Sequence, residues 1–117
     1  MIKNPIILGI ESSCDETAAS IITENKERTP IILSSVISSQ VDVHKEFGGV
    51  VPELAARSHM EKIDWIVQKA INDSGRTIEE IDAVASTAGP GLIVCLSVGL
   101  SFGKAFASAL ELSLIHI

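Results

Sequence analysis

Apolar residues fall into three short runs near the start of the chain, and polar or turn-forming residues bound each run. The runs at 6–10, 18–23 and 31–38 are rich in isoleucine, a β-branched residue that favours strands. Short polar segments separate them, the second being a charged turn that ends at Pro30. The pattern predicts three consecutive strands in an antiparallel meander.

The hydrophobic period changes after Pro52, a residue that suits the first turn of a helix. Apolar residues then recur at three- and four-residue steps, and Asp73-Ser74-Gly75 predicts the end of this helix. Its expected apolar stripe comprises Ala56, Met60, Ile63, Ile66, Val67, Ala70 and Ile71.

The last third of the chain repeats a strand–helix–strand pattern. A capping box at 77–80 precedes an expected strand over 81–87, a sharp turn, a helix from 92 to about 110, and a strand over 112–117. The second helix is apolar nearly all round, so we expect it to be buried. Its Gly99 and Gly103 would let another backbone approach closely.

The predicted order is β-β-β-α-β-α-β, in which a meander leads into two right-handed crossovers. This is the layout of the ribonuclease H-like α/β fold, a mixed sheet with helices packed on it, and of the half-domain of actin/hexokinase-type ATPases. At 117 residues the chain is expected to form one domain or a piece of a larger one. In this fold class the turn of the first hairpin faces nucleotide phosphates.

Composition narrows the class of protein. Hydrophobic residues make up 46 % of the chain but only four are aromatic, which predicts an aliphatic core. The net charge of −6 argues against a broad basic nucleic-acid surface in this segment, although another part or a partner could hold a nucleic acid. Two distant cysteines predict reduced thiols in a cytosolic protein. No secretory signal or membrane span is expected.

The first turn, Glu11 to Thr17, concentrates hydroxyl and carboxylate side chains directly after a buried strand. Such groups can face an anion, hold a cation or accept a proton. They can equally cap their own backbone in an acidic hairpin. The turn alone leaves both interpretations open.

Three blocks of the sequence resemble one family closely. They are 9–17 (GIESSCDET), 39–59 (SQVDVHKEFGGVVPELAARSH) and 87–92 (TAGPGL) with the glycine-containing helix after it. On these blocks the chain resembles the N-terminal part of the tRNA N6-adenosine threonylcarbamoyltransferases, the TsaD family, formerly described as O-sialoglycoprotein endopeptidases. The resemblance covers nearly the whole chain. It implies that residues 1–117 are a partial N-terminal lobe of a two-lobed actin-like ATPase fold, with the second lobe absent.

The resemblance implies an acyltransferase that moves a threonylcarbamoyl group from threonylcarbamoyl-AMP to N6 of adenosine 37, in tRNAs that read ANN codons. It also implies a cytoplasmic protein that works with a paralogous, TsaB-like heterodimer partner and a small, TsaE-like ATPase, without DNA or membrane. We expect this chain alone to be inactive.

The resemblance also implies roles for individual residues. Asp15 and Glu16 are the candidate catalytic carboxylates, with Asp15 first, and Ser13 is a candidate substrate-binding residue of the same turn. A carboxylate makes chemical sense there, because an adenine amine must lose a proton as it is acylated. We expect Cys14 to be a packed small residue rather than a nucleophile.

His44, Glu53 and Arg57 of the middle block are the further substrate-binding candidates, and the role of His59 stays open. Glu53 and Arg57 stand four residues apart, so a local ion pair is an equally simple interpretation.

The family's divalent metal, Fe²⁺ or Zn²⁺, is implied to be held by residues beyond Ile117, so we assign no metal ligand here, His116 included. The last residues, 111–117, also depart from the family pattern. Two other functions remain open. A small-metabolite kinase of the actin fold would use the turn carboxylates for Mg²⁺ and ATP, and a paralogue-type module would only bind a partner.

Overall fold

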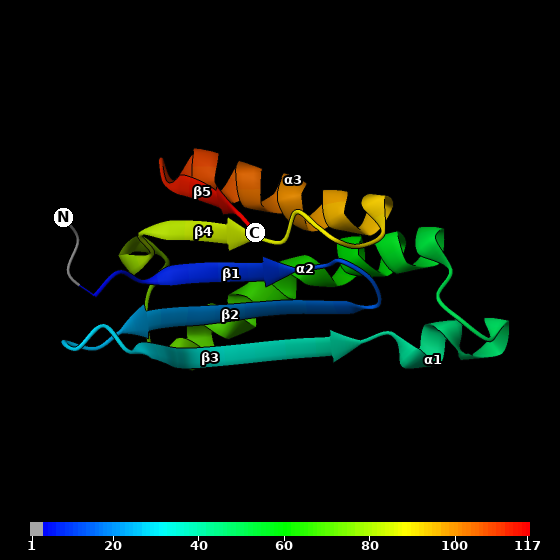
Figure 1. Cartoon of the computed structure of the whole chain (residues 1–117), viewed down its shortest axis with the longest axis horizontal. Helices are drawn as coiled ribbons and strands as arrows, with labels where there is room; N and C mark the ends of the chain where they lie inside the picture. The colour runs from blue at the N-terminus through cyan, green and yellow to red at the C-terminus, as the bar shows by residue number, and fades with distance from the viewer. Residues whose placement is uncertain (1–3) are drawn as a thin grey trace.

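One five-stranded mixed sheet organises the computed structural model, which describes residues 4–117. The strands are β1 (Ile7–Glu11), β2 (Glu16–Glu24), β3 (Pro30–Ser39), β4 (Ala83–Ser86) and β5 (Ser113–His116). The helices are α1 (Val41–His44), η1 (Lys45–Phe47), α2 (Pro52–Ser74), η2 (Ile78–Glu80) and α3 (Ile93–Ala109). The strand order is β3-β2-β1-β4-β5, and the two long helices lie behind the sheet in Figure 1.

The topology confirms the predicted meander and both crossovers. β1 pairs antiparallel with β2, and β2 pairs antiparallel with β3. α2 carries the chain to β4, which pairs parallel with β1, and α3 carries it to β5, which pairs parallel with β4. A mixed sheet of this order, with helices packed on it, is the ribonuclease H-like half-domain.

Local signals end the elements where the sequence indicated. α2 ends at Gly75, whose φ of 75° is left-handed and whose N–H donates to the carbonyl of Asn72. The capping box before β4 is present, because the carboxylate of Glu80 accepts from the N–H of Thr77.

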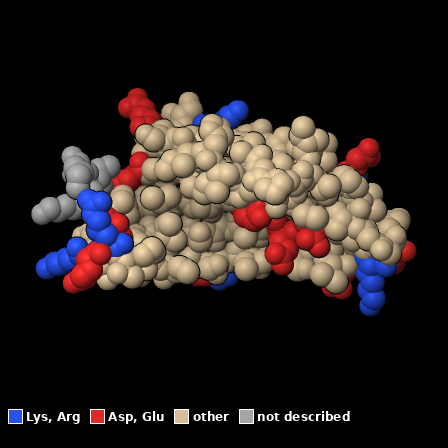
Figure 2. Space-filling model, viewed as in Figure 1, with Lys and Arg blue, Asp and Glu red and all other residues tan. Residues whose placement is uncertain are grey.

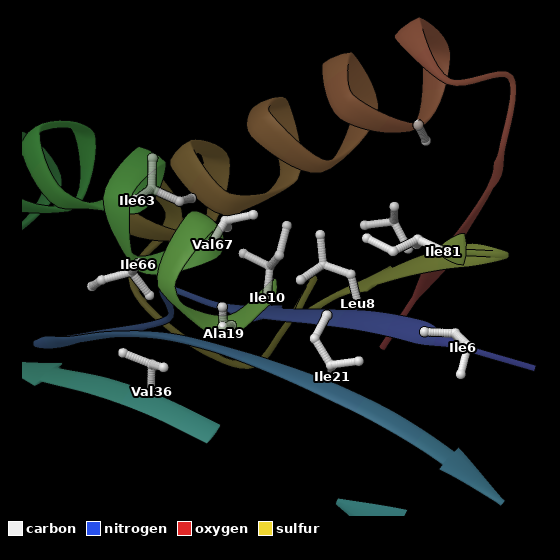
Figure 3. Packing of buried hydrophobic residues seen from close by; sticks show 13 residues of the cluster. Ile6, Leu8, Ile10, Ala19, Ile21, Val36, Ile63, Ile66, Val67 and Ile81 are labelled. Carbon is white, nitrogen blue, oxygen red and sulfur yellow. The ribbon is translucent and has the colours of Figure 1, made fainter. Parts of the chain in front are cut away.

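The hydrophobic core lies between the sheet and the two long helices (Figure 3). Alternate residues of the central strands point into it, and every second residue points to the opposite face. That opposite face has no helix over it in the described part of the chain (Figure 1) and is called the open face below. The buried apolar residues of the core are Ile6, Leu8, Ile10, Ala19, Ile21, Val36, Ile63, Ile66, Val67, Ala70, Ile81, Val84 and Ala107.

Two burial predictions were wrong. α3 is buried along one side only, through Cys95, Leu96, Gly99, Gly103 and Ala107, while Ile93 at its start is 81 % exposed. The reason is that α3 contacts α2 and the β1–β4–β5 side of the sheet, and nothing in the described residues covers its outer side.

In α2 one residue of the expected apolar stripe does not face the core. Met60 is 68 % exposed, and the polar side chains of Ser58 and His59 are buried in its place. Across residues 4–117 we find no helix with the length and apolar character needed to cross a membrane.

Candidate functional site

The carboxyl ends of the three parallel strands meet at one edge of the sheet. Glu11 ends β1, Ser86 ends β4 and His116 ends β5, and the register pairs Ile10 with Ser86 and Ser86 with His116. In open α/β sheets, ligands bind at this edge. The first turn therefore lies where the fold class places chemistry.

Carboxylates gather at this edge. Figure 2 shows a cluster of acidic side chains over the turn between β1 and β2, where the chain carries Glu11, Asp15 and Glu16. The β1–β2 register places Glu11 opposite Ala18, so Glu11 and Glu16 share the open face. A hollow of about 240 Å³ on this face is bordered by Glu11 and Thr87.

Glu11 holds the turn together. One carboxylate oxygen accepts from the N–H of Ser13 at 2.7 Å, and the other accepts from the Ser13 hydroxyl at 2.8 Å. The Ser13 carbonyl in turn accepts from the N–H of Leu92 at 2.8 Å. The self-capping interpretation of the acidic turn therefore applies to Glu11, and the Ser13 hydroxyl keeps only its acceptor capacity for a ligand.

The carboxylates of Asp15 and Glu16, unlike that of Glu11, are not engaged within the turn. Their side chains make no hydrogen bond or ion pair to any other described residue, and Asp15 is half-buried while Glu16 is exposed. Both carboxylates are thus free to meet a substrate. Their catalytic role remains a prediction.

The thiols are held in the protonated form. Burial raises the pKa of Cys14, and the nearby carboxylates of Asp15 and Glu11 raise it further. Burial likewise raises the pKa of Cys95. Because the thiolate is the nucleophilic form, the environment of Cys14 disfavours nucleophilic chemistry, in line with its expected packing role.

Two glycines let α3 and its leading loop approach the turn. A Cβ at Gly99 would lie 2.6 Å from the hydroxyl oxygen of Ser12, and a Cβ at Gly91 would lie 2.7 Å from the carbonyl oxygen of Ser13. The buried Ser12 hydroxyl accepts from the N–H of Gly99 at 3.0 Å and donates to the carbonyl of Cys95 at 2.7 Å. Gly99 thus allows a close approach, but the nearest atoms belong to the side chains of Ser12 and Ile10, whereas the sequence predicts another backbone there.

His59 is fully buried directly behind the turn. Its Nε2 lies 2.9 Å from the carbonyl oxygen of Cys14, and its Nδ1 lies 2.6 Å from the hydroxyl of Thr17. Burial lowers the pKa of His59, more than the hydrogen bond to Cys14 and the carboxylates of Glu11 and Asp15 raise it. A neutral imidazole therefore supports the turn from inside the molecule.

His44 is also buried, in the short helix after β3. Its Nε2 lies 2.9 Å from Oε1 of Gln40, and its Nδ1 accepts from the N–H of Val51 at 3.1 Å. Both ring nitrogens are thus engaged within the fold. A role in substrate binding remains a prediction for His44.

Glu53 and Arg57 do not lie at the β1–β2 turn. They line a shallow groove of about 640 Å³ with Met60 and Val94, on the helical side of the molecule and away from the open face. They form no ion pair with each other, although the i, i+4 spacing favours one. The structure does not bring them together with Glu11 and Glu16.

The family's metal stays a prediction, because its ligands are expected beyond Ile117. Among residues 4–117, no three histidine, cysteine, aspartate or glutamate side chains gather closely enough to hold an ion.

Three residues near the turn were not singled out from the sequence: Glu11, Thr17 and Gln40. Each is polar and sits at a strand end or directly after one, which was the available signal. Gln40 and Thr17 are fully buried. The alternation of β2 puts Thr17 on the same face as Ala19 and Ile21, and the alternation of β3 puts Gln40 in phase with Val36, so the strand period was a further signal.

Comparison with known proteins supports the sequence resemblance. A family model described as tRNA N6-adenosine threonylcarbamoyltransferase matches residues 31–117. Proteins of that name are similar to the chain: that of Pelagibacter ubique is 74 % identical over all 117 residues, and that of Syntrophomonas wolfei is 50 % identical over the same length. The chain spans 33 % of the length of each of these relatives.

Solved structures show the same fold at low sequence identity. YeaZ from Pseudomonas aeruginosa matches 97 % of this chain and 43 % of its own, with a TM-score of 0.68 and 17 % identity. RuvC of T. thermophilus, solved with a Holliday junction substrate, matches 96 % of this chain and 65 % of its own, with a TM-score of 0.60 and 11 % identity. At such identities the likeness concerns the fold alone.

Proposed function

Because the chain belongs to the tRNA N6-adenosine threonylcarbamoyltransferase family, we propose that it supplies one wall of the active site of such an enzyme. The whole protein would transfer a threonylcarbamoyl group from threonylcarbamoyl-AMP to N6 of adenosine 37 of tRNA. The observation that supports a role in the chemistry is the pair of unengaged carboxylates, Asp15 and Glu16, at the carboxyl edge of three parallel strands.

The proposed step is an acyl transfer. The adenine amine attacks the carbonyl carbon of the threonylcarbamoyl group, a C–N bond forms, and the bond to the AMP phosphate oxygen breaks. The amine must lose one proton, which the carboxylate of Asp15 accepts, with Glu16 as the second candidate. Positioning the two substrates and stabilising the developing charge are the remaining tasks.

The other expected contacts belong to this proposal. Ser13 would accept a hydrogen bond from substrate at the turn, and Glu53 and Arg57 would contribute from the helical side. His44 would contribute from within the fold, where its ring nitrogens are engaged. A paralogous partner, a small ATPase, a divalent metal held outside this segment and a cytoplasmic location complete the proposal. Sequencing the gene beyond Ile117 tests whether the metal ligands are encoded there, since a His-x-x-x-His motif is expected.

The test uses a full-length hybrid protein, in which residues 1–117 replace the matching third of the Pelagibacter ubique relative. It is assayed with tRNA, threonine, bicarbonate, ATP and the partner proteins, and modified adenosine is measured by mass spectrometry. We expect the hybrid to modify tRNA. A hybrid that folds but forms no product, while the natural relative does, would refute the proposal.

Asp15→Asn in the hybrid should lower the rate by about 10²–10⁴-fold, the usual contribution of a positioned acid or base. Glu27→Gln is the matched control, because Glu27 is an exposed carboxylate on the distant β2–β3 turn. Full activity of Asp15→Asn would remove Asp15 from the mechanism, and a loss in Glu16→Gln alone would transfer the role to Glu16.

A further inference from the structure

We propose that Gln40 and His59 are positioning residues for the β1–β2 turn, acting through a hydrogen-bond chain in which each link from Val51 to Cys14 donates toward the turn. The inference rests on the proposed function, in which that turn carries the reacting carboxylates. Neither residue touches the open face where substrate would lie. Their effect is transmitted through the carbonyl of Cys14 and, for Gln40, also through the carbonyl of Asp15.

This hydrogen-bond chain starts at Val51, directly before α2, where the donor and the acceptor follow from the chemistry of the two groups. The backbone N–H of Val51 can only donate, so Nδ1 of His44, 3.1 Å away, is an acceptor and carries no proton. A neutral imidazole holds its one proton on the other nitrogen. Nε2 of His44 therefore donates to Oε1 of Gln40 at 2.9 Å.

That contact fixes the orientation of the Gln40 amide. With Oε1 facing His44, the NH₂ group faces the carbonyl of Ala55 and Nδ1 of His59, both at 3.3 Å. Nδ1 of His59 is then an acceptor, and its one lone pair is shared between the Thr17 hydroxyl at 2.6 Å and the Gln40 amide at 3.3 Å. The single proton of this imidazole is on Nε2, which donates to the carbonyl of Cys14 at 2.9 Å.

One arrangement of protons thus satisfies every link from Val51 to Cys14. Turning the Gln40 amide would place its NH₂ against the Nε2–H of His44, and charging either imidazole would place two donors face to face. The side chains of His44, Gln40 and His59 are buried, so a broken link between them could not be replaced by solvent.

The last link of the hydrogen-bond chain, from His59 to the carbonyl of Cys14, lies beside the candidate carboxylates. Cys14 lies between Ser13 and Asp15, so fixing its carbonyl fixes the peptide planes that carry both side chains. The N–H of Gln40 also donates to the carbonyl of Asp15 at 2.9 Å. Gln40 therefore reaches the turn by two routes, one through its backbone and one through His59.

Two substitutions in the full-length hybrid distinguish the contribution of Nε2 of His59 from that of Nδ1. In His59→Gln the side-chain amide can occupy the place of Nε2 and keep the donor to Cys14. In His59→Asn the shorter amide keeps an acceptor near Nδ1 but loses that donor. We expect His59→Gln to keep the rate within about threefold, and His59→Asn to lower kcat at least about tenfold with KM changed less than threefold.

Hydrogen exchange of the peptide covering 11–18 is measured in the same variants and does not depend on activity. We expect faster exchange of this turn in His59→Asn than in His59→Gln. Equal exchange and equal kcat in the two variants, or greater loss in His59→Gln, would overturn the positioning role. An inactive parent hybrid would refute the proposed function only, because the exchange result would still decide the role of His59.

Ser34→Ala is the matched control for lost stability. The buried Ser34 hydroxyl donates to the carbonyl of Ala70 at 2.6 Å, and among residues 4–117 it makes no hydrogen bond to the turn or to Gln40 and His59. We expect this variant to lower the unfolding temperature while kcat and exchange at 11–18 stay unchanged. If it lowered kcat as much as His59→Asn does, a general loss of stability would explain both.

Discussion

Carboxylates of the same turn serve different purposes at the scale of single residues. The carboxylate of Glu11 accepts hydrogen bonds from the N–H and hydroxyl of Ser13. The carboxylates of Asp15 and Glu16 have no hydrogen-bond or ion-pair partner among the described residues. Both carboxylate oxygens of Glu11 already accept a hydrogen bond from Ser13, which leaves that carboxylate less capacity to bind a substrate. The unengaged pair is therefore the better place to look for proton transfer.

The buried His59 should make stability depend on pH. Its pKa is lowered mainly by burial and also by Lys62, against the Cys14 carbonyl and the carboxylates of Glu11 and Asp15, which raise it. An unfolded histidine titrates near about 6.5. Below that pH the unfolded chain binds a proton that the folded chain still excludes, so the free energy of unfolding falls, by at most about 1.4 kcal/mol per pH unit.

Unfolding temperatures of the full-length hybrid between pH 7.5 and pH 5 measure this effect. The parent should lose stability as pH falls below about 6.5, and His59→Gln should lose less over the same interval because it removes one titrating group. Identical pH profiles for the two proteins would contradict the prediction.

At the scale of elements, the fit of α3 against the first turn depends on Gly99. An added methyl group there would meet the buried Ser12 oxygen at 2.6 Å and disturb its bonds to Gly99 and Cys95. Overpacking of this kind destabilises by about 1–3 kcal/mol, which outweighs the gain of roughly 1 kcal/mol in helix propensity. We expect Gly99→Ala to accelerate hydrogen exchange along α3.

Gly103→Ala is the control on the same helix. A Cβ at Gly103 would meet Leu114 and Ser86 at 3.4 Å, an ordinary contact distance. Here the gain in helix propensity should dominate, so exchange should stay the same or slow. The explanation fails if both substitutions change exchange alike.

Local patterns predicted most of these elements, because strand alternation, the proline at the start of α2 and the stop at Gly75 are encoded by neighbouring residues. What the sequence could not indicate depends on distant contacts. The burial of His44 and His59 arises where three segments meet, and the exposure of α3 depends on what lies over it. The free carboxylates could be predicted as candidates, but separating Glu11 from them required the hydrogen bonds.

On the scale of the whole molecule, apolar side chains are exposed on both sides. Ile37 on the open face is 61 % exposed, and Met60 and Ile93 are exposed on the helical side. Contiguous exposed apolar surface favours association. We expect the isolated 117-residue chain to self-associate in a concentration-dependent manner.

Sedimentation velocity at several concentrations tests this expectation. Ile37→Lys and Met60→Lys, compared one at a time, show which side carries the contact, because a charge is costly to bury in an interface. A monodisperse monomer at every concentration would contradict it.

The strand order has a consequence for how the chain acquires its structure. β1, β2 and β3 are neighbours in sequence and pair locally, but β1 must also pair with β4, whose Ala83 lies opposite Ile7. Closing a long loop carries an entropic penalty, so the meander should form before β4 and β5 add to the other side of β1. During synthesis, the meander and α2 can therefore organise first, and the carboxyl edge that carries the site is completed last. Pulse-labelled hydrogen exchange during refolding of the hybrid should protect β2 amides before β4 amides, and the reverse order would contradict this sequence of events.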